Sequence, residues 1–318
     1  MRMNLVLGTI TVGQQTFFDE TKAMVESFLA DGYFEIDTAY VYNEGECEKI
    51  LGQVFQEIDR RSYSIATKAN PRISGKLDGE AVRTQLLESL DRMGIVHADI
   101  FYLHFPDPYT PVESALEACH ELHQVGTFKE LGLSNFPAWM VADVYHKCKQ
   151  NGWVLPTIFE GVYNPLSRKA ETELFAALRE FGLRFYAYNP LAGGMLTGKY
   201  ETFEDSPDGG RFALRDSYPE RYWKKSFFDA VDVIREASGE LNMIEASFRW
   251  LAHHSMLDAE MGDAIIIGAS NLKQLQQNLA TFNKGPLSEE IVAAFDEAWK
   301  ISNPDSPEYF TLFKGKVQ

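Results

Sequence analysis

The amino-acid sequence predicts an α/β protein, a (β/α)8 TIM barrel, and three observations carry that prediction. Eight short runs rich in apolar, β-branched and aromatic residues recur along the 318 residues. Segments with helical periodicity separate them, and such strict alternation implies a parallel sheet covered by helices. The run "LGTITVG" after the first apolar run does not match the G-x-G-x-x-G turn that opens a doubly wound sheet.

The eight expected strands lie near the following residues: 4–8, 33–39, 63–68, 99–104, 128–135, 157–164, 184–190 and 263–268. The expected helical segments are 19–30, 46–57, 78–93, 112–125, 137–151, 168–181, 227–254 and 271–282. Asp78 is placed to cap the third of these helices, and Ser270 or Asn271 to cap the last.

No linker or low-complexity tract divides the chain, so we expect a single domain over residues 1–318. The site is expected at the C-terminal end of the barrel strands. One long irregular insert, at about 200–223, follows the seventh strand, and inserts of that length are usually lids or binding loops.

Composition excludes several classes of protein. A formal net charge of −16 argues against nucleic acid or an anionic membrane as partner, although a local basic pocket is still allowed. Cys47, Cys119 and Cys148 form no C-x-x-C pair, so neither a disulfide framework nor a thiolate metal site is expected. No apolar run reaches about 18 residues, and the N-terminus has no signal-peptide pattern. We therefore expect a soluble, cytoplasmic protein without a metal site.

Four polar residues fall at or just after consecutive strand ends: Asp37, Tyr42, Lys68 and His104. A barrel would gather all four around its mouth. Tyr42 is the expected general acid, with its pKa lowered by the Lys68 ammonium, which Asp37 orients. His104 would hydrogen-bond a substrate oxygen, and the set suits carbonyl reduction by hydride.

Each of these residues also has a structural interpretation: a turn or cap for Asp37, packing for Tyr42, a solvated Lys68, an interior His104. Their joint placement on successive strand ends favours the catalytic one. A second enzymatic alternative is a Schiff-base aldolase using Lys68, which Asp37 disfavours by keeping the lysine charged.

The chain resembles the aldo-keto reductases, in particular the branch of aflatoxin-aldehyde and succinic-semialdehyde reductases. The resemblance runs from about Leu5 to Trp299 and rests on blocks such as "IDTAYVYNEGECEKILG", "GTFKELGLSNFPAW", "RFYAYNPLAGGMLTGKY" and "GASNLKQLQQNL". It implies reduction of small-molecule aldehydes with NADPH as cofactor, in a homodimer. It makes Asp37, Tyr42, Lys68 and His104 the catalytic tetrad, with Tyr42 as proton donor.

The resemblance also implies the residues that bind the nicotinamide. Ser134 and Asn135 match those that hold the carboxamide, and Tyr188 matches the aromatic residue that stacks on the ring. The family usually has Gln in the pattern Q-x-x-Y-N, where this chain has Glu160. A carboxylate accepts but does not donate unless it is protonated, so we expect altered nicotinamide binding, and an ionised Glu160 would favour the oxidised cofactor.

The stretch "LAGGMLTGKY" contains a G-x-x-x-x-G-K run, but Tyr200 follows Lys199 where a P-loop has the Ser or Thr that holds Mg²⁺. We expect the run to wrap the pyrophosphate of the dinucleotide rather than to bind ATP. Asn189, Pro190, Leu191, Ala192, Gly193, Gly194, Leu196, Thr197, Gly198 and Lys199 are its candidate cofactor residues.

The adenosine end is expected at the start of the last barrel helix. Its candidate residues are Gly268, Ser270, Gln274, Gln277 and Asn278. Many relatives have Lys and Arg at the positions of Gly268 and Gln274, whereas the aflatoxin-aldehyde branch tends to have Gln, so NADP(H) is the expected cofactor. Arg211, in the insert, is a candidate phosphate partner, with a surface arginine as the alternative.

Relatives in this branch tend to have an Arg after the C-terminal "YF", where this chain has Thr311. The sequence therefore does not predict a preference for carboxylated aldehydes, and Lys314 and Lys316 are the possible substitutes. The alternative to an enzyme is a nucleotide-binding regulatory subunit with vestigial activity, similar to the potassium-channel β-subunits.

Overall fold

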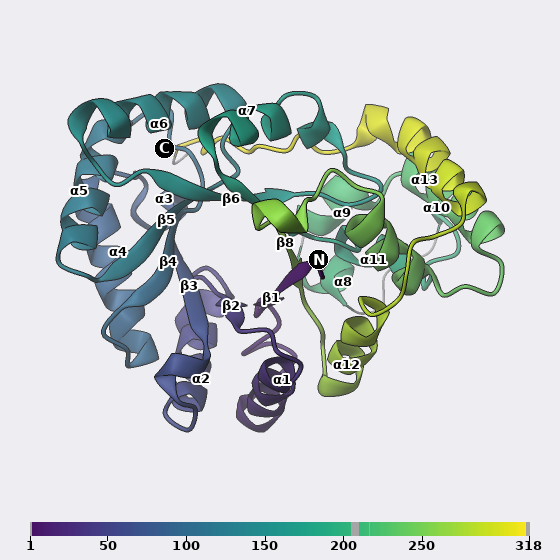
Figure 1. The fold of residues 1–318 in the computed structure, drawn as a ribbon, viewed down its shortest axis with the longest axis horizontal. Coiled ribbons are helices and arrows are strands. Elements are labelled where there is room, and N and C mark those ends of the chain that lie inside the picture. The colour runs from purple at the N-terminus through teal and green to yellow at the C-terminus, as the bar shows by residue number, and fades with distance from the viewer. Residues whose placement is uncertain (1, 205–209, 216, 316–318) are drawn as a thin grey trace.

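The computed structural model describes residues 2–204, 210–215 and 217–315, and its sheet is a closed barrel of eight parallel strands in the order β1 to β8 (Figure 1). The strands are β1 (Asn4–Gly8), β2 (Glu35–Asp37), β3 (Ser64–Ala69), β4 (Ala98–Leu103), β5 (Phe128–Ser134), β6 (Pro156–Val162), β7 (Arg184–Tyr188) and β8 (Ala264–Ile267). β1 pairs with β8 from Asn4↔Ala264 to Leu7↔Ile267, which closes the sheet. The predicted (β/α)8 barrel and its eight strands are confirmed.

Helices surround this barrel on the outside (Figure 1). The α-helices are α1 (Phe18–Ala30), α2 (Glu46–Phe55), α3 (Pro71–Ser74), α4 (Gly79–Met93), α5 (Val112–Gln124), α6 (Ala138–Asn151), α7 (Leu174–Phe181), α8 (Arg211–Leu214), α9 (Ser217–Tyr222), α10 (Lys225–Ser238), α11 (Met243–His253), α12 (Leu272–Thr281) and α13 (Glu289–Ser302). Short 3-10 turns include η1 (Asn43–Gly45), η3 (Lys169–Glu171) and η4 (Ala192–Thr197). None of the described helices combines the length and apolarity that crossing a bilayer requires.

Two helical segments differ from the sequence-based expectation. The predicted helix over 227–254 is divided into α10 and α11, because Gly239 adopts φ +55° and Asn242 starts a new helix by accepting from the backbone N–H of Ile244. The predicted segment 168–181 begins as the 3-10 turn η3 and becomes α-helical only at Leu174. Helix α13 was not predicted at all.

The insert after β7 was expected to be irregular, but its described part contains α8 and α9. Residues 205–209 and 216 of the predicted insert lie outside the described residues. Tyr218 and Tyr222, both on α9, are buried, so α9 packs into the molecule rather than extending from it.

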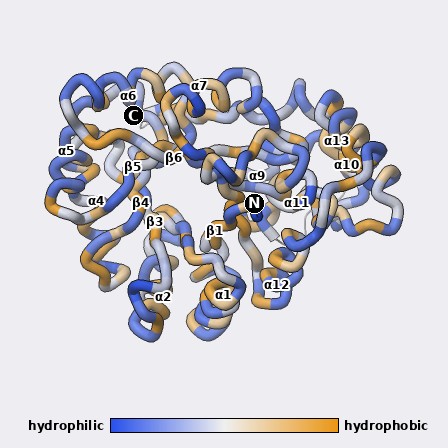
Figure 2. The backbone as a smooth tube through the Cα atoms, in the orientation of Figure 1, coloured by the Kyte–Doolittle hydropathy of each residue, from blue (hydrophilic) through white to orange (hydrophobic). Residues whose placement is uncertain are grey.

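The apolar core lies in two layers, one between the strands and the helices and one inside the barrel. Figure 2 shows apolar stretches along the strands, while the outer helices alternate between apolar and polar residues. Inside the barrel, the ring of Tyr102 occupies the space beside Gly132, where a Cβ would lie 2.3 Å from a ring carbon. Tyr102 belongs to the apolar cluster inside the barrel, and Lys68 Nζ lies 5.4 Å from its ring centroid. This apolar layer therefore contacts the polar residues at the C-terminal end of the barrel.

Two predicted features of helix capping are confirmed. Asp78 Oδ1 accepts from the backbone N–H of Ala81 at 2.9 Å, at the start of α4. Of the two candidates at the last barrel helix, Asn271 caps α12 through the backbone N–H of Gln274 at 2.9 Å.

The C-terminal segment after α13 returns across the molecule toward α6 (Figure 1). The backbone N–H of Thr311 donates to the Asn135 carbonyl, and that of Phe313 to the Pro106 carbonyl, both at 3.1 Å. Asn135 follows β5 and Pro106 follows β4, so this segment lies on the strand-end loops, where a barrel has its site.

Candidate active site

The four predicted catalytic residues lie together at the C-terminal ends of β2, β3 and β4. Asp37 is the last residue of β2, Lys68 is in β3, and His104 follows β4. Tyr42, just before η1, lies with its Oη 3.5 Å from Asp37 Oδ1 and 3.5 Å from Lys68 Nζ. The ring centroids of Tyr42 and His104 are 6.4 Å apart.

Lys68 is the buried cation at the centre of this cluster, with 1% of its surface exposed. Its Nζ donates a short hydrogen bond to Asp37 Oδ2 and another, of 3.0 Å, to the Thr38 carbonyl. Burial acts to lower the pKa of Lys68, but Asp37 and Glu160 outweigh it and the net shift is upward. A lysine held in the charged form is a poor nucleophile, which disfavours the Schiff-base alternative.

The expected lowering of the Tyr42 pKa by Lys68 is wrong for this structure. Burial raises the pKa of Tyr42 well above its usual value, and the carboxyl groups of Asp37 and Glu160 raise it further. The phenol is therefore protonated at neutral pH, with its proton available for donation.

His104 is a neutral imidazole in the wall of the site. Burial, and then the positive charges of Lys68 and Arg72, keep the pKa of His104 well below its usual value. Asn70 Oδ1 accepts from the backbone N–H of Arg72, so the Asn70 amide nitrogen is the group that faces His104 Nδ1, at 3.2 Å. Because that nitrogen is a donor, Nδ1 accepts and the ring proton is on Nε2, which can donate to a substrate oxygen.

Glu160, on β6, brings a second carboxyl group to the same lysine. Its Oε2 lies 3.4 Å from Lys68 Nζ and makes no hydrogen bond of regular geometry to a described residue. Burial, and next the nearby Asp37, raise the pKa of Glu160 to about 8, against the opposing effect of Lys68. The protonated form therefore predominates at neutral pH, so the ionised Glu160 considered from the sequence is not the resting state.

The residues expected to hold the nicotinamide form a hydrogen-bonded group beside the catalytic cluster. Tyr188 Oη donates to Asn135 Oδ1 at 2.7 Å, and Asn135 Nδ2 donates to the His104 carbonyl at 3.0 Å and to Ser134 Oγ at 2.9 Å. Asn135 adopts φ +62°, a left-handed conformation that Asn tolerates better than most residues. Ser134 is fully buried behind this group, and Tyr188 and Asn135 face the cavity.

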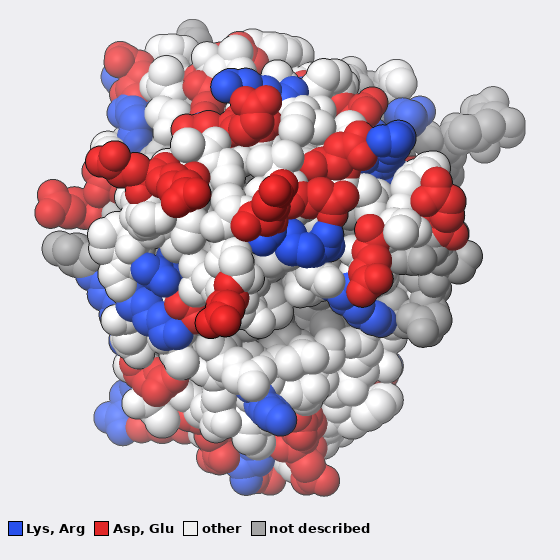
Figure 3. Space-filling view, turned by 90° about the vertical axis from the view of Figure 1, so that its right-hand side faces the viewer, with Lys and Arg blue, Asp and Glu red and all other residues white. Residues whose placement is uncertain are grey.

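A cavity of about 1040 Å³ opens above these residues. Figure 3 shows a hollow in one face of the molecule with Lys and Arg side chains at its rim. Its lining includes most of the predicted site residues: Asp37, Tyr42, His104, Asn135, Glu160, Tyr188, Asn189, Pro190, Leu191, Gly193, Gly194, Thr197, Lys199, Arg211, Gly268, Ser270, Gln274, Gln277 and Asn278. This volume is at the upper end of the range for small-molecule sites.

Five of the predicted residues do not line this cavity. Lys68 and Ser134 are buried behind its wall, and Ala192 and Leu196 point into the apolar core. Gly198 takes φ +74° at the end of η4, next to Met243.

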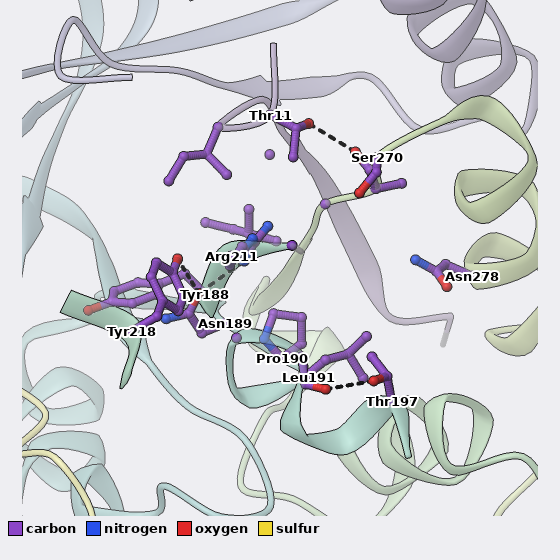
Figure 4. A pocket seen from close by; sticks show the side chains of 18 of the residues that line it. Thr11, Tyr188, Asn189, Pro190, Leu191, Thr197, Arg211, Tyr218, Ser270 and Asn278 are labelled. Carbon is purple, nitrogen blue, oxygen red and sulfur yellow. Dashed lines mark hydrogen bonds between the residues drawn. The ribbon is translucent and has the colours of Figure 1, made fainter. Parts of the chain in front are cut away.

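The glycine-rich loop is folded as the 3-10 turn η4. Gly193 and Gly194 adopt φ +70° and +121° inside it. A Cβ on Gly193 would lie 2.5 Å from Tyr218, so only glycine lets α9 pack this closely on the loop. Figure 4 shows Leu191 and Thr197 of this segment on one side of the cavity, with Thr11 and Ser270 on another.

Arg211 projects into the middle of this cavity (Figure 4). One guanidinium nitrogen lies 3.3 Å from Asn189 Oδ1, and the group stands 5.7 Å from the Tyr218 ring centroid. A Cβ on Gly268 would lie 2.8 Å from Arg211 Nη2, so the absence of a side chain there makes room for the guanidinium. Arg211 is thus a cavity residue rather than a surface-loop arginine.

Sequence reasoning missed several cationic residues of the site. Arg215 lines the same cavity and donates to Asn43 Oδ1 at 3.0 Å. Arg72 and Arg221 line it near Tyr188. Arg215 and Arg221 could have been predicted as cavity residues, because both lie in the insert that was expected to be a lid or binding loop. Arg72 follows the dipeptide "NP" after the third strand, a pattern that does not predict a cavity residue.

A second, smaller cavity of about 710 Å³ shares Arg72, Tyr188 and Arg221 with the first. The C-terminal segment forms its other side with Thr311 and Lys314. Lys316, the other predicted candidate, lies outside the described residues. Over the described part of the chain, no group of three His, Cys, Asp or Glu side chains is placed to hold a metal ion.

Comparisons with known proteins agree with this geometry. The model of the "Aldo/keto reductase family" matches residues 4–300. The chain is 45% identical to "Aflatoxin B1 aldehyde reductase member 2" of Mus musculus, over 98% of this chain and 88% of the relative. It is 46% identical to the Homo sapiens protein of that name (97% and 90% covered) and 45% identical to "Aldo-keto reductase family 7 member A3" of Homo sapiens (96% of each). With the barrel and the Asp37–Tyr42–Lys68–His104 cluster, these matches show that the chain belongs to the aldo/keto reductase family.

Proposed function

We propose that the protein is an NADPH-dependent reductase of aldehydes. The observation that carries the proposal is the position of Tyr42 Oη, 3.5 Å from both Lys68 Nζ and Asp37 Oδ1 at the inner end of a large cavity. The names of the relatives, aflatoxin B1 aldehyde reductases, support the aldehyde as substrate class.

The residues of the cluster have separate tasks in this reaction. Reduced nicotinamide, when bound, supplies the hydride. Nε2–H of His104 and the Tyr42 hydroxyl donate to the carbonyl oxygen, which polarises the carbonyl group and fixes its direction. As negative charge develops on that oxygen, Tyr42 gives it the phenolic proton, and the Lys68 ammonium stabilises the phenolate that remains.

NADPH rather than NADH is the second part of this proposal. Arg211 and Arg215 both line the cavity, and neither forms an ion pair with a described carboxylate. Guanidinium groups bind phosphate oxygens strongly, and the 2′-phosphate of NADPH adds charge that NADH lacks. Ser270, Gln274, Gln277 and Asn278, which line the same cavity, are proposed to hold the adenosine end.

The test is NADPH consumption with an aldehyde by the wild-type protein and by Tyr42→Phe. We expect the variant to lose about 10²- to 10⁴-fold in kcat/KM, the usual contribution of a general acid, while NADPH binding measured by fluorescence is retained. Wild-type protein that binds NADPH but turns over no aldehyde would instead support the regulatory-subunit alternative.

We also infer that the preferred aldehydes carry a carboxylate. This preference was not predicted from the sequence, but Arg72 and Arg221 line the cavity beside Tyr188 without an ion pair to a described carboxylate. Burial, and then the charge of Arg221, lower the pKa of Arg72, as expected for two cations held close together. An anion placed between them would relieve that repulsion.

A kinetic comparison tests this inference. Wild-type protein should show at least tenfold higher kcat/KM for succinic semialdehyde than for an uncharged aldehyde of similar size, about the effect of one charge-assisted hydrogen bond. Arg221→Met should remove most of that ratio while activity on the uncharged aldehyde is kept. Equal ratios in the two proteins would contradict a role for Arg221.

The remaining expectations also belong to this proposal: a single domain over 1–318, a homodimer and a cytoplasmic location. Cys47, Cys119 and Cys148 are all free and buried, which suits a reducing compartment. The mass of the protein in solution, measured by light scattering, tests the dimer.

A further inference from the structure

The inner end of the cavity has two carboxyl groups for one ammonium. Asp37 and Glu160 both reach Lys68, and the three residues are buried, with at most 3% of their surface exposed. If both carboxyl groups were ionised, the cluster would carry a net negative charge out of contact with water. Such an uncompensated buried charge is strongly unfavourable, so the cluster retains one proton.

The hydrogen bonds show which carboxyl group retains this proton. Asp37 accepts the short hydrogen bond from Lys68 and lies 3.5 Å from the Tyr42 hydroxyl, so its charge is compensated twice. Glu160 has a 3.4 Å contact with Lys68 and lies within hydrogen-bond reach of the Asp37 carboxyl group, and its Oε2 lacks a hydrogen-bond donor among the described residues. Its negative charge is the less stabilised of the two, in agreement with the raised pKa of its carboxyl group.

The other groups that act on Glu160 do not compensate its charge. The titratable and charged side chains around it are Asp37 of β2, Tyr42 before η1, Lys68 of β3, Tyr102 of β4 and Tyr188 of β7. Lys68 is the only cation among them, and burial raises the pKa of all three tyrosines, so each stays neutral.

We propose that Glu160 is a second proton-bearing residue of the site: it keeps its proton while the cavity holds the neutral reduced cofactor and releases it when the cavity holds the cationic oxidised form. Glu160 lines the cavity at the Tyr42 end, where the reacting ring must lie, so the inference rests on the proposed reductase function. A positive charge in this low-dielectric space stabilises the carboxylate and not the acid.

The released proton has a short path to the group that needs one after reduction. Tyr42 loses its O–H proton to the substrate oxygen, Lys68 gives an N–H proton to the phenolate, and Glu160 gives its O–H proton to the Lys68 nitrogen. Glu160 ends as a carboxylate, while Tyr42 and Lys68 regain their starting forms. The distances are 3.5 Å from Lys68 Nζ to Tyr42 Oη and 3.4 Å from Lys68 Nζ to Glu160 Oε2. Exchange of the oxidised cofactor then lets Glu160 take a proton from water.

The experiment counts protons released on cofactor binding, without any substrate. Binding of NADP⁺ and of NADPH is measured by calorimetry at pH 7 in two buffers that differ in ionisation enthalpy. Both cofactors carry the same 2′-phosphate, whose own titration near pH 6 therefore cancels in the difference between them. We expect wild-type protein to release close to one proton more with NADP⁺ than with NADPH, and Glu160→Gln to show no difference.

Glu35→Gln is the matched control. Glu35 is a partly buried carboxyl group at the start of β2, hydrogen-bonded to Tyr186 and away from the cavity lining, and burial raises its pKa also. This variant should behave like the wild-type protein. Equal proton release by wild type and Glu160→Gln would overturn the proposal, and so would loss of the release in Glu35→Gln.

The pH dependence of affinity gives a second readout. Below the pKa of Glu160, the ratio of NADP⁺ to NADPH affinity should rise about tenfold per pH unit in wild type, because one proton is exchanged. The ratio should be independent of pH in Glu160→Gln, and a slope retained there contradicts the proposal. These outcomes can be told apart from failure of the proposed function. If the proposed function is wrong, wild-type protein either binds neither NADP⁺ nor NADPH, or binds them and reduces no aldehyde.

Discussion

At the scale of single residues, the site combines a buried lysine that contacts two carboxyl groups with arginines that form no ion pair to a described carboxylate. Lys68 has two carboxyl groups within reach, whereas the partners of Arg211 among the described residues are the Asn189 side chain, at 3.3 Å, and the Tyr218 ring. Most arginines elsewhere pair with a carboxylate, as Arg92 does with Glu48. An arginine kept in a cavity on neutral contacts is placed to receive an anion from outside the protein.

Arg211→Met should therefore weaken NADPH binding. Loss of a charge-assisted hydrogen bond costs about 1.5–3 kcal/mol, so the Kd should rise roughly tenfold to a hundredfold. Fluorescence titration with NADPH and NADH measures the change, and a larger loss for NADPH would assign Arg211 to the 2′-phosphate.

Arg61→Met is the control for this measurement. Arg61 is exposed and forms an ion pair with Asp59. It lies just before the start of β3, at the end of the barrel away from the site loops. An unchanged NADPH affinity in Arg211→Met would remove Arg211 from the cofactor site.

The sequence predicted the positions of the candidate catalytic residues better than their protonation. Strand-end spacing was enough to place Asp37, Lys68 and His104 at one mouth, because strand ends in a closed barrel must converge. The pKa of Tyr42 depends instead on how deeply its ring is buried and on Glu160, a residue 118 positions away (160 − 42) that the fold brings close. Sequence spacing contains neither quantity.

At the scale of elements, the strands were predicted more closely than the helices at the end of the chain. Buried parallel strands are short apolar runs that stand out from their surroundings. The boundary between α10 and α11 was missed because apolar periodicity continues on both sides of it, and only Gly239 and Asn242 mark the break. Helix α13 packs against α10 and has exposed acidic residues in its first turn, so it follows the last barrel unit without adding a strand.

Elements α8 and α9 connect this fold to function. They carry Arg211, Tyr218 and Arg221 to the cavity, so the insert supplies much of its positive charge. Length alone predicted a binding loop. The packing of Tyr218 against Gly193 holds α9 on the glycine-rich loop. It could not be predicted, because the sequence does not show that these two residues come into contact.

At the scale of the whole molecule, a chain of net charge −16 has a cavity lined by several arginines. Figure 3 shows acidic side chains over much of the same face, around the hollow. The overall charge works against the binding of polyanions, whereas the local positive charge of the cavity favours an anionic ligand. The two levels of charge are compatible because surface charges are screened within about 10 Å at ordinary ionic strength.

The buried carboxyl cluster also links the stability of the whole protein to pH. The pKa of Glu160 is about 8 in the folded protein and near 4.5 once unfolding exposes it. Between these values the folded state holds one proton more than the unfolded state, so the contribution of Glu160 to stability is full below pH 4.5 and is lost as pH rises toward 8.

The variant Glu160→Gln tests this link, because the Gln side chain does not titrate and avoids this loss of stability. The free energy of unfolding of Glu160→Gln, relative to wild type, should therefore increase steadily from pH 5 to pH 8 in urea titrations of the cofactor-free proteins. A difference that stays constant over this range would mean that Glu160 is ionised throughout, and the proton-release proposal would fail with it.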